Sequence, residues 1–205
     1  MDKLEELHYF ATAIYAIKAP QFMDAVRNVA LHYLDQSRVK DTKQMTVMTS
    51  NFSHEKSIEN FSQYVSQSTW NILSSQGFNM DQLVTFFSEM WCQEHNYQSA
   101  IDTHMHGNGS AMSVFYFLDV PENACSMIIH DPRPAKVITN LPVADDSKMT
   151  MASTHITFTP EAGILLFAPP WLPHQFTRNN SIKPMRFVHM NLSVTTAPQP
   201  QVEVI

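Results

Sequence analysis

The pattern of hydrophobic and polar positions changes character near residue 77. Before it, two stretches repeat apolar residues every three or four positions, which is the spacing of an amphipathic helix. After it, short apolar runs follow one another between Pro, Asn and Asp residues, a pattern that is typical of strands joined by turns. The chain therefore predicts helices first and then an antiparallel β-sandwich or barrel.

The predicted helices cover Phe22–Leu34 and Ile58–Leu73, with Ser57 as the cap of the second helix and Gly77 as its end. A polar loop from Arg133 to Thr154 interrupts the β-core, and loops of this length are usually functional or mobile. The other predicted segments are a strand-like stretch (His8–Lys18), a polar surface connection (Asp41–Lys56) and six core strands (Leu83–Trp91, Ala111–Val120, Ser126–His130, His155–Thr159, Ile164–Ala168 and Met185–Val194).

Length and composition predict one intracellular domain of 205 residues, in which residues 1–80 support a β-core at 81–194 and residues 195–205 form a tail. The net charge of −6 argues against nucleic acid and anionic membranes as partners. We find no signal-peptide layout and no apolar stretch long enough to span a membrane, so a cytoplasmic location is expected. Cys92 and Cys125 lack a metal-binding spacing, and we expect two free, buried thiols.

The candidate chemistry lies in three histidines. His104 and His106 stand two positions apart on an extended segment, so their side chains point to the same face. His174 follows a buried strand and a stiff Pro-rich turn that can aim one side chain. Three such histidines can cap one side of a divalent metal, as in the facial triads that hold non-heme Fe(II), although those triads usually include a carboxylate. An alternative set therefore replaces one histidine of the pair with Asp131.

Arg186 is the second candidate site residue. It lies twelve residues after His174, on a predicted strand whose alternate residues are largely apolar. An arginine that points into a β-core needs a carboxylate as its partner. That partner is either an internal Asp or Glu or the distal carboxylate of a dicarboxylic cosubstrate. Histidines on other core strands, among them His189, are expected to be core or cavity-wall residues.

Five motifs follow in order along the second half of the chain, and together they resemble a known family. They are Gly109–Leu118, Val120–Ala124, His130–Arg133, Phe167–His174 and Arg186–Asn191. The set resembles the 2-oxoglutarate/Fe(II)-dependent oxygenases of bacteria and phages, which are related to the prolyl hydroxylases. The resemblance covers roughly residues 85–193.

The resemblance implies a mostly β fold, a double-stranded β-helix (jelly roll) with N-terminal flanking helices, and the cofactors Fe(II) and 2-oxoglutarate. His104 and His174 match the two invariant histidines, and His106 falls where the wider superfamily has Asp or Glu. Arg186 matches the basic residue that pairs with the 2-oxoglutarate carboxylate, and Tyr116 lies on a strand that can help to hold it.

The sequence departs from the family pattern at Val114 and Cys125, where glycines are usual, and both changes would narrow a wall of the site. The expected activity is hydroxylation of a small-molecule or peptide substrate with release of succinate and CO₂. Two alternatives remain. One is a cupin-type dioxygenase or isomerase without 2-oxoglutarate, although residues 107–112 lack the usual Glu. The other is a non-catalytic jelly-roll module. The chain is also compatible with a homodimer.

Overall fold

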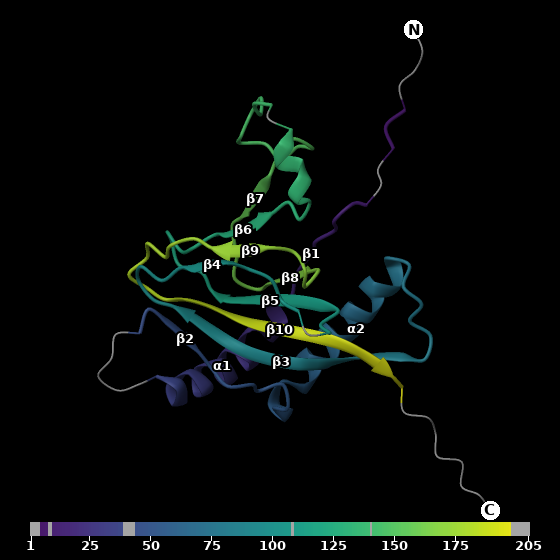
Figure 1. Ribbon diagram of the computed structural model, residues 1–205. Helices are drawn as coiled ribbons and strands as arrows, with labels where there is room; N and C mark the ends of the chain where they lie inside the picture. The colour runs from purple at the N-terminus through teal and green to yellow at the C-terminus, as the bar shows by residue number, and fades with distance from the viewer. Residues whose placement is uncertain (1–4, 8–9, 39–43, 108, 140, 198–205) are drawn as a thin grey trace, which may run out of the picture.

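The computed structural model describes residues 5–7, 10–38, 44–107, 109–139 and 141–197. Three layers make up the described part of the chain (Figure 1). Two helices cover one face of a large antiparallel sheet, and a smaller antiparallel sheet faces the other side of it. The helices are α1 (Met23–Ser37) and α2 (Glu59–Ser75), and short 3-10 turns lie at η1 (Pro20–Phe22), η2 (Lys56–Ile58) and η3 (Pro134–Ile138).

The strands pair entirely in antiparallel fashion and form two sheets with the orders β1-β8-β5-β10-β3-β2 and β4-β9-β6-β7. Strands that follow one another along the chain often lie in opposite sheets, which is the arrangement of a double-stranded β-helix. The predicted jelly roll with N-terminal helices is thereby confirmed. The strands are β1 (Tyr15–Lys18), β2 (Thr46–Met48), β3 (Leu83–His95), β4 (Ile101–His104), β5 (Met112–Asp119), β6 (Met127–His130), β7 (His155–Phe158), β8 (Ile164–Ala168), β9 (His174–Phe176) and β10 (Met185–Thr196).

One hydrophobic core lies between the helices and the large sheet. Helix α1 buries Val26, Ala30 and Leu34, which are four residues apart and therefore lie on one face of the helix. Helix α2 adds Phe61 and Val65 in the same way. These side chains pack on the outer face of β3, β5 and β10, so the helices cover one side of the large sheet.

A second core lies between the two sheets, and it adjoins the candidate site. It contains Phe115 and Phe117 from β5, Phe187 from β10 and Phe176 from β9. Both faces of β5 are buried as a result, one under the helices and one under the small sheet. The large sheet therefore separates two apolar interiors, and the buried side chains of β5 are divided between them.

Some details differ from the prediction. The expected surface connection contains β2, an edge strand of the large sheet whose Val47 is buried. Ser57 lies inside η2 and does not cap α2, which begins at Glu59 without a side-chain cap bond. Gly77 ends α2 as predicted, with φ at +94° and its N–H donating to the Ser74 carbonyl at 3.0 Å.

The first predicted strand is shorter than expected, because only Tyr15–Lys18 forms β1; residues 8–9 lie outside the described residues, as does most of the predicted tail (198–205). Both cysteines are free and buried, as predicted. In the part of the chain that the structure describes, no helix is long and apolar enough to cross a membrane.

Candidate metal centre

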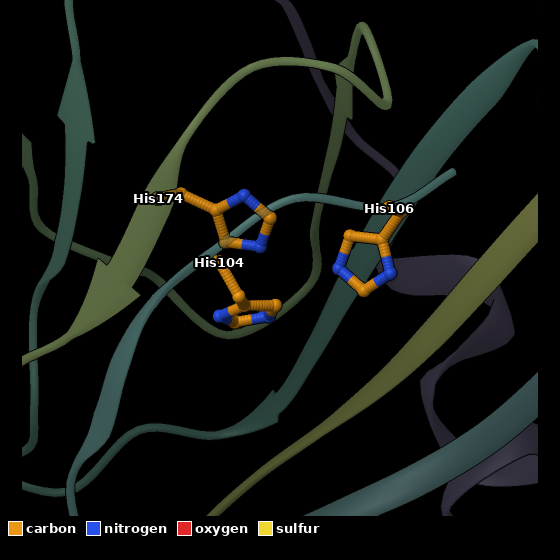
Figure 2. Close-up of side chains that lie close together, drawn as sticks. All are labelled: His104, His106 and His174. Carbon is orange, nitrogen blue, oxygen red and sulfur yellow. The ribbon is translucent and has the colours of Figure 1, made fainter.

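Three histidine rings converge at one end of the small sheet. His104 of β4 and His174 of β9 are direct cross-strand neighbours, and their ring centroids lie 4.5 Å apart. His106 follows two residues after β4 and brings its ring within 5.2 Å of His174. One ligand atom from each of the three residues lies within 4.8 Å of the other two. Figure 2 shows the three rings turned toward one another, as the HxH pattern predicts.

Backbone carbonyls orient two of these rings. The His104 Nδ1 atom lies 2.9 Å from the Asp102 carbonyl oxygen, and the His174 Nδ1 atom lies 3.0 Å from that of Leu172. A carbonyl oxygen only accepts, so each Nδ1 carries the proton and each Nε2 keeps its lone pair. Metal-binding histidines are commonly held in this way, because the bond fixes both the tautomer and the ring direction.

The Pro-rich turn at residues 169–173 positions two of the histidines. It leads directly into His174, as the sequence predicts. It also anchors His106, whose backbone N–H donates to the Pro170 carbonyl at 2.8 Å. The two segments that carry the candidate ligands are therefore tied together by the main chain, independently of any bound ion.

Burial keeps His106 and His174 neutral. Burial, with the neighbouring histidines as a smaller cause, lowers the pKa of His106 to about 4. Burial likewise lowers the pKa of His174 to about 4. The Nε2 atoms of both rings are buried and have no hydrogen-bond partner in the protein. Neutral rings with free Nε2 lone pairs are what a divalent metal requires, so this donor set fits a metal ion such as Fe(II).

A fourth histidine lies beside the cluster. His189 of β10 is fully buried, and its ring lies 4.3 Å from those of His106, Trp91 and Phe115. Its Nε2 atom has no hydrogen-bond partner, and burial lowers its pKa well below the ordinary value. The sequence predicted that His189 is a core or cavity-wall residue and not a ligand, which agrees with this position. The only available signal was its alternation with Phe187 and Asn191 along the strand.

Asp131 lies apart from the histidine cluster. Its carboxylate accepts bonds from Arg133 at 2.7 and 2.9 Å and pairs with Lys136 at 3.0 Å. These bonds hold the pKa of Asp131 well below its ordinary value. It also accepts the Arg133 backbone N–H at 3.0 Å, so it stabilises the turn after β6. Asp131 is not among the converging ligand atoms.

Arg186 does not point toward the histidines, and the expectation that it would is wrong. Its Nε donates to Glu94 at 2.6 Å and its Nη1 donates to Asp119 at 2.9 Å. Arg38, just after α1, binds the same Glu94, and Arg27 of α1 binds the same Asp119. Arg186 is therefore part of an ion-pair network on the face of the large sheet that the helices cover. This is the internal salt bridge that the sequence left open as the alternative.

Tyr116 also faces the helices, contrary to expectation. Its hydroxyl donates to the Ala19 carbonyl at 2.7 Å, and its ring lies 5.0 Å from Phe61 of α2. Burial raises the pKa of Tyr116 to about 12, so the hydroxyl stays protonated and acts as a donor. Both residues that the resemblance assigned to 2-oxoglutarate thus lie on the far side of the sheet from the three histidines.

Residues 89–188 match a family model described as "Putative 2OG-Fe(II) oxygenase". This segment contains all three histidines of the cluster. Nearly half of the chain therefore resembles the 2-oxoglutarate/Fe(II)-dependent oxygenases in sequence. Enzymes of this family use Fe(II) and 2-oxoglutarate, so the resemblance found in the sequence is confirmed. No curated protein matches the chain.

Solved structures of 2-oxoglutarate/Fe(II)-dependent oxygenases share the fold. An oxidoreductase of this family from Burkholderia pseudomallei has a TM-score of 0.57 at 11% identity, with 88% of this chain and 84% of that one covered. HygX from Streptomyces hygroscopicus, solved with nickel and 2-oxoglutarate, has a TM-score of 0.58 at 12% identity, with 89% of this chain and 83% of that one covered. A Pseudomonas putida prolyl-4-hydroxylase has a TM-score of 0.55 at 10% identity, with 92% of this chain and 94% of that one covered. At such low identities the likeness establishes the fold alone.

The family's two cofactors fit the site unequally. The three histidines offer the nitrogen donors that Fe(II) takes, and they would leave the remaining coordination positions free. The distal carboxylate of 2-oxoglutarate has no partner in Arg186 or Tyr116, because both side chains are committed to groups on the opposite face.

Proposed function

We propose that this oxygenase is an Fe(II)- and 2-oxoglutarate-dependent hydroxylase of a small-molecule or peptide substrate, with succinate and CO₂ as co-products. The observation that carries the proposal is the convergence of His104, His106 and His174 in the family's fold. When bound, Fe(II) would supply the redox chemistry that couples O₂ and the 2-oxo acid to hydroxylation of a C–H bond.

The protein's own side chains define the geometry of this centre and exclude water from it. The three histidines would hold the metal from one side and would leave its other side to the cosubstrate and O₂. Trp91, Phe115 and His189 cover the inner side of the cluster with stacked and edge-on rings. Such a wall excludes water, which strengthens electrostatic interactions at the metal and limits side reactions. As neutral ligands, the three imidazoles would leave the ion its full charge, and this would favour an anionic cosubstrate.

A cavity of about 370 Å³ next to the Pro-rich turn is the candidate seat of the substrate. Leu172, whose carbonyl orients the His174 ring, lines it, together with Ile129 and Ile156. Met151, from the long loop between β6 and β7, closes another side. This volume suits a small molecule or one amino-acid side chain of a peptide, and the lining combines apolar side chains with the charged residues Asp131 and Arg133.

Anaerobic titration tests the proposal. Purified protein is loaded with Fe(II), 2-oxoglutarate is added, and the weak visible charge-transfer band of the iron–2-oxo acid pair is followed. Air is then admitted and succinate is measured. We expect the band and succinate from the parent protein and from a control, His54→Ala, whose residue is exposed between β2 and η2. We expect neither from His174→Ala.

The proposal fails if the Fe(II)-loaded protein binds no 2-oxo acid at all. It also fails if His174→Ala binds iron and 2-oxoglutarate as the parent does, because the three histidines would then not be the centre.

A further inference from the structure

The residues of β10 alternate between the two hydrophobic cores. Met185 and Phe187 belong to the core between the sheets, which is the interior that the metal centre adjoins. Val188 belongs to the core under the helices. Because successive side chains of a strand point to opposite faces, Arg186 shares the helix side with Val188, in agreement with its ion pairs. The inner position next to Arg186 is therefore taken by a methionine.

Strand β5 shows the same alternation. Phe115 and Phe117 point into the interior between the sheets, whereas Tyr116 points to the helices. The residues before and after Tyr116 along the strand are therefore the inner ones, and both are phenylalanines, which have no group to bind a carboxylate. On both strands the polar residue expected to bind the cosubstrate lies one position away from the inner face.

The interior beside the histidines is filled with aromatic rings. Phe115 lies 5.3 Å from His174 and 6.1 Å from Phe187, and Phe187 stacks on Phe176 at 4.8 Å. These rings form one buried cluster that also contains Met185 of β10. Among the described residues, no lysine or arginine is buried. A carboxylate placed there would lose its water and gain no cation, which is strongly unfavourable.

We propose that this metal centre has no interior binding site for the distal carboxylate of 2-oxoglutarate and holds the cosubstrate by its 2-oxo acid end alone. The inference rests on the proposed function, which it refines. Its consequence is relaxed cosubstrate choice: a 2-oxo acid with a short apolar chain, such as 2-oxobutyrate, binds about as well as 2-oxoglutarate. An enzyme with an arginine at the inner position would instead favour 2-oxoglutarate, because a bidentate pair would be lost with the shorter acid.

The test compares two affinities in the Fe(II)-loaded protein under anaerobic conditions. The dissociation constants of 2-oxoglutarate and 2-oxobutyrate are measured by calorimetry and by the visible band. We expect them to agree within about threefold. If 2-oxoglutarate binds at least tenfold more tightly, the inference is overturned while the proposed function stands. If neither acid binds, both the proposed function and the inference fail.

Arg186→Lys supplies an independent readout on the same two ligands. A lysine keeps the charge but lacks the planar fork, so it would weaken a carboxylate pair. We expect the ratio of the two dissociation constants to stay within twofold of the parent, as it does in Arg178→Lys, a control at an exposed position. A selective loss of 2-oxoglutarate affinity in Arg186→Lys alone would overturn the inference, because it would place this guanidinium on the cosubstrate.

Discussion

Arg186 and Glu94 form an ion pair, with 2.6 Å between Nε and Oε2, on the face of the large sheet that the helices cover. Glu94 is almost wholly buried, and it also accepts a 2.7 Å bond from Arg38. Burial alone would raise the pKa of Glu94, but the bonds from Arg38 and Arg186 outweigh it and lower the pKa. The pair therefore joins β10 to β3 and, through Arg38, to the end of α1.

Loss of this guanidinium should destabilise the fold. Arg186→Met would leave Glu94 with one cation and Asp119 with Arg27 alone. Breaking a buried pair costs about 3–5 kcal/mol, and since Arg186 is partly exposed we expect about 2–4 kcal/mol here. Urea unfolding measures the loss. Arg178→Met, at an exposed position, should cost less than about 0.5 kcal/mol.

A second substitution separates unpaired charge from lost packing. Adding Glu94→Gln to Arg186→Met removes one carboxylate that has lost a partner, so part of the stability should return. The free energy of unfolding is also measured for Glu94→Gln alone. If Glu94→Gln costs as much in the Arg186→Met background as it does in the parent, the two residues act independently and the network is not as described.

The sequence predicted the fold well because the signals it used are local. Helical spacing located α1 and α2 to within a few residues, and β8 was predicted with its observed bounds. The short strand β2 was missed. Three residues in a polar segment carry almost no alternation, and β2 exists because it pairs with the end of β3. That pairing joins residues more than forty positions apart, which a local pattern does not contain.

The site was predicted in part, and the failure has one physical cause. His104 and His106 lie within one short segment, so their common face follows from the spacing alone. Tyr116 lies on a strand buried on both faces, where apolar residues follow one another without alternation. Such a strand does not reveal which side chains face which core, and an error of one position moves every residue to the opposite face. The same error was made for Arg186.

Metal binding should depend on each of the three histidines. His104→Ala, His106→Ala and His174→Ala each remove one nitrogen donor, and even outer-shell changes cost about 10–100-fold in affinity. We expect parent protein loaded with Fe(II) to retain about one ion per chain after desalting, and each variant to retain little. Elemental analysis provides the measurement, with His155→Ala as the control. Full retention in His106→Ala would reduce the set to two histidines.

Asp131→Asn should leave metal content unchanged, because Asp131 is bound to Arg133 and Lys136 and not to the cluster. It should instead loosen the loop after β6, since the amide offers weaker acceptors to these two cations. We expect faster proteolysis within residues 133–154 and an unaltered ion count. Loss of the ion with the loop still protected would favour the ligand set that includes Asp131.

The last prediction concerns pH and the metal-free protein. Burial lowers the pKa of His95 to about 4, whereas an unfolded histidine titrates near 6.5. Between these values the unfolded chain binds a proton that the folded chain does not. The free energy of unfolding should therefore fall as the pH drops from 6.5 toward 4, by up to about 1.4 kcal/mol per pH unit for each such group. Above pH 6.5 this contribution is complete.

His106 and His174 add to the same slope when no metal is bound, because burial lowers their pKa values in the same direction. His95 lies in the core near Phe176 and Phe187, so its share can be removed without touching the cluster. We expect His95→Gln to reduce the slope of the unfolding free energy against pH between pH 6.5 and 4.5 by up to about 1.4 kcal/mol per pH unit, the contribution of one proton. His155→Gln is an exposed control. Urea unfolding at several pH values measures it. An unchanged slope in His95→Gln would mean that His95 takes up its proton equally in the folded and unfolded chains.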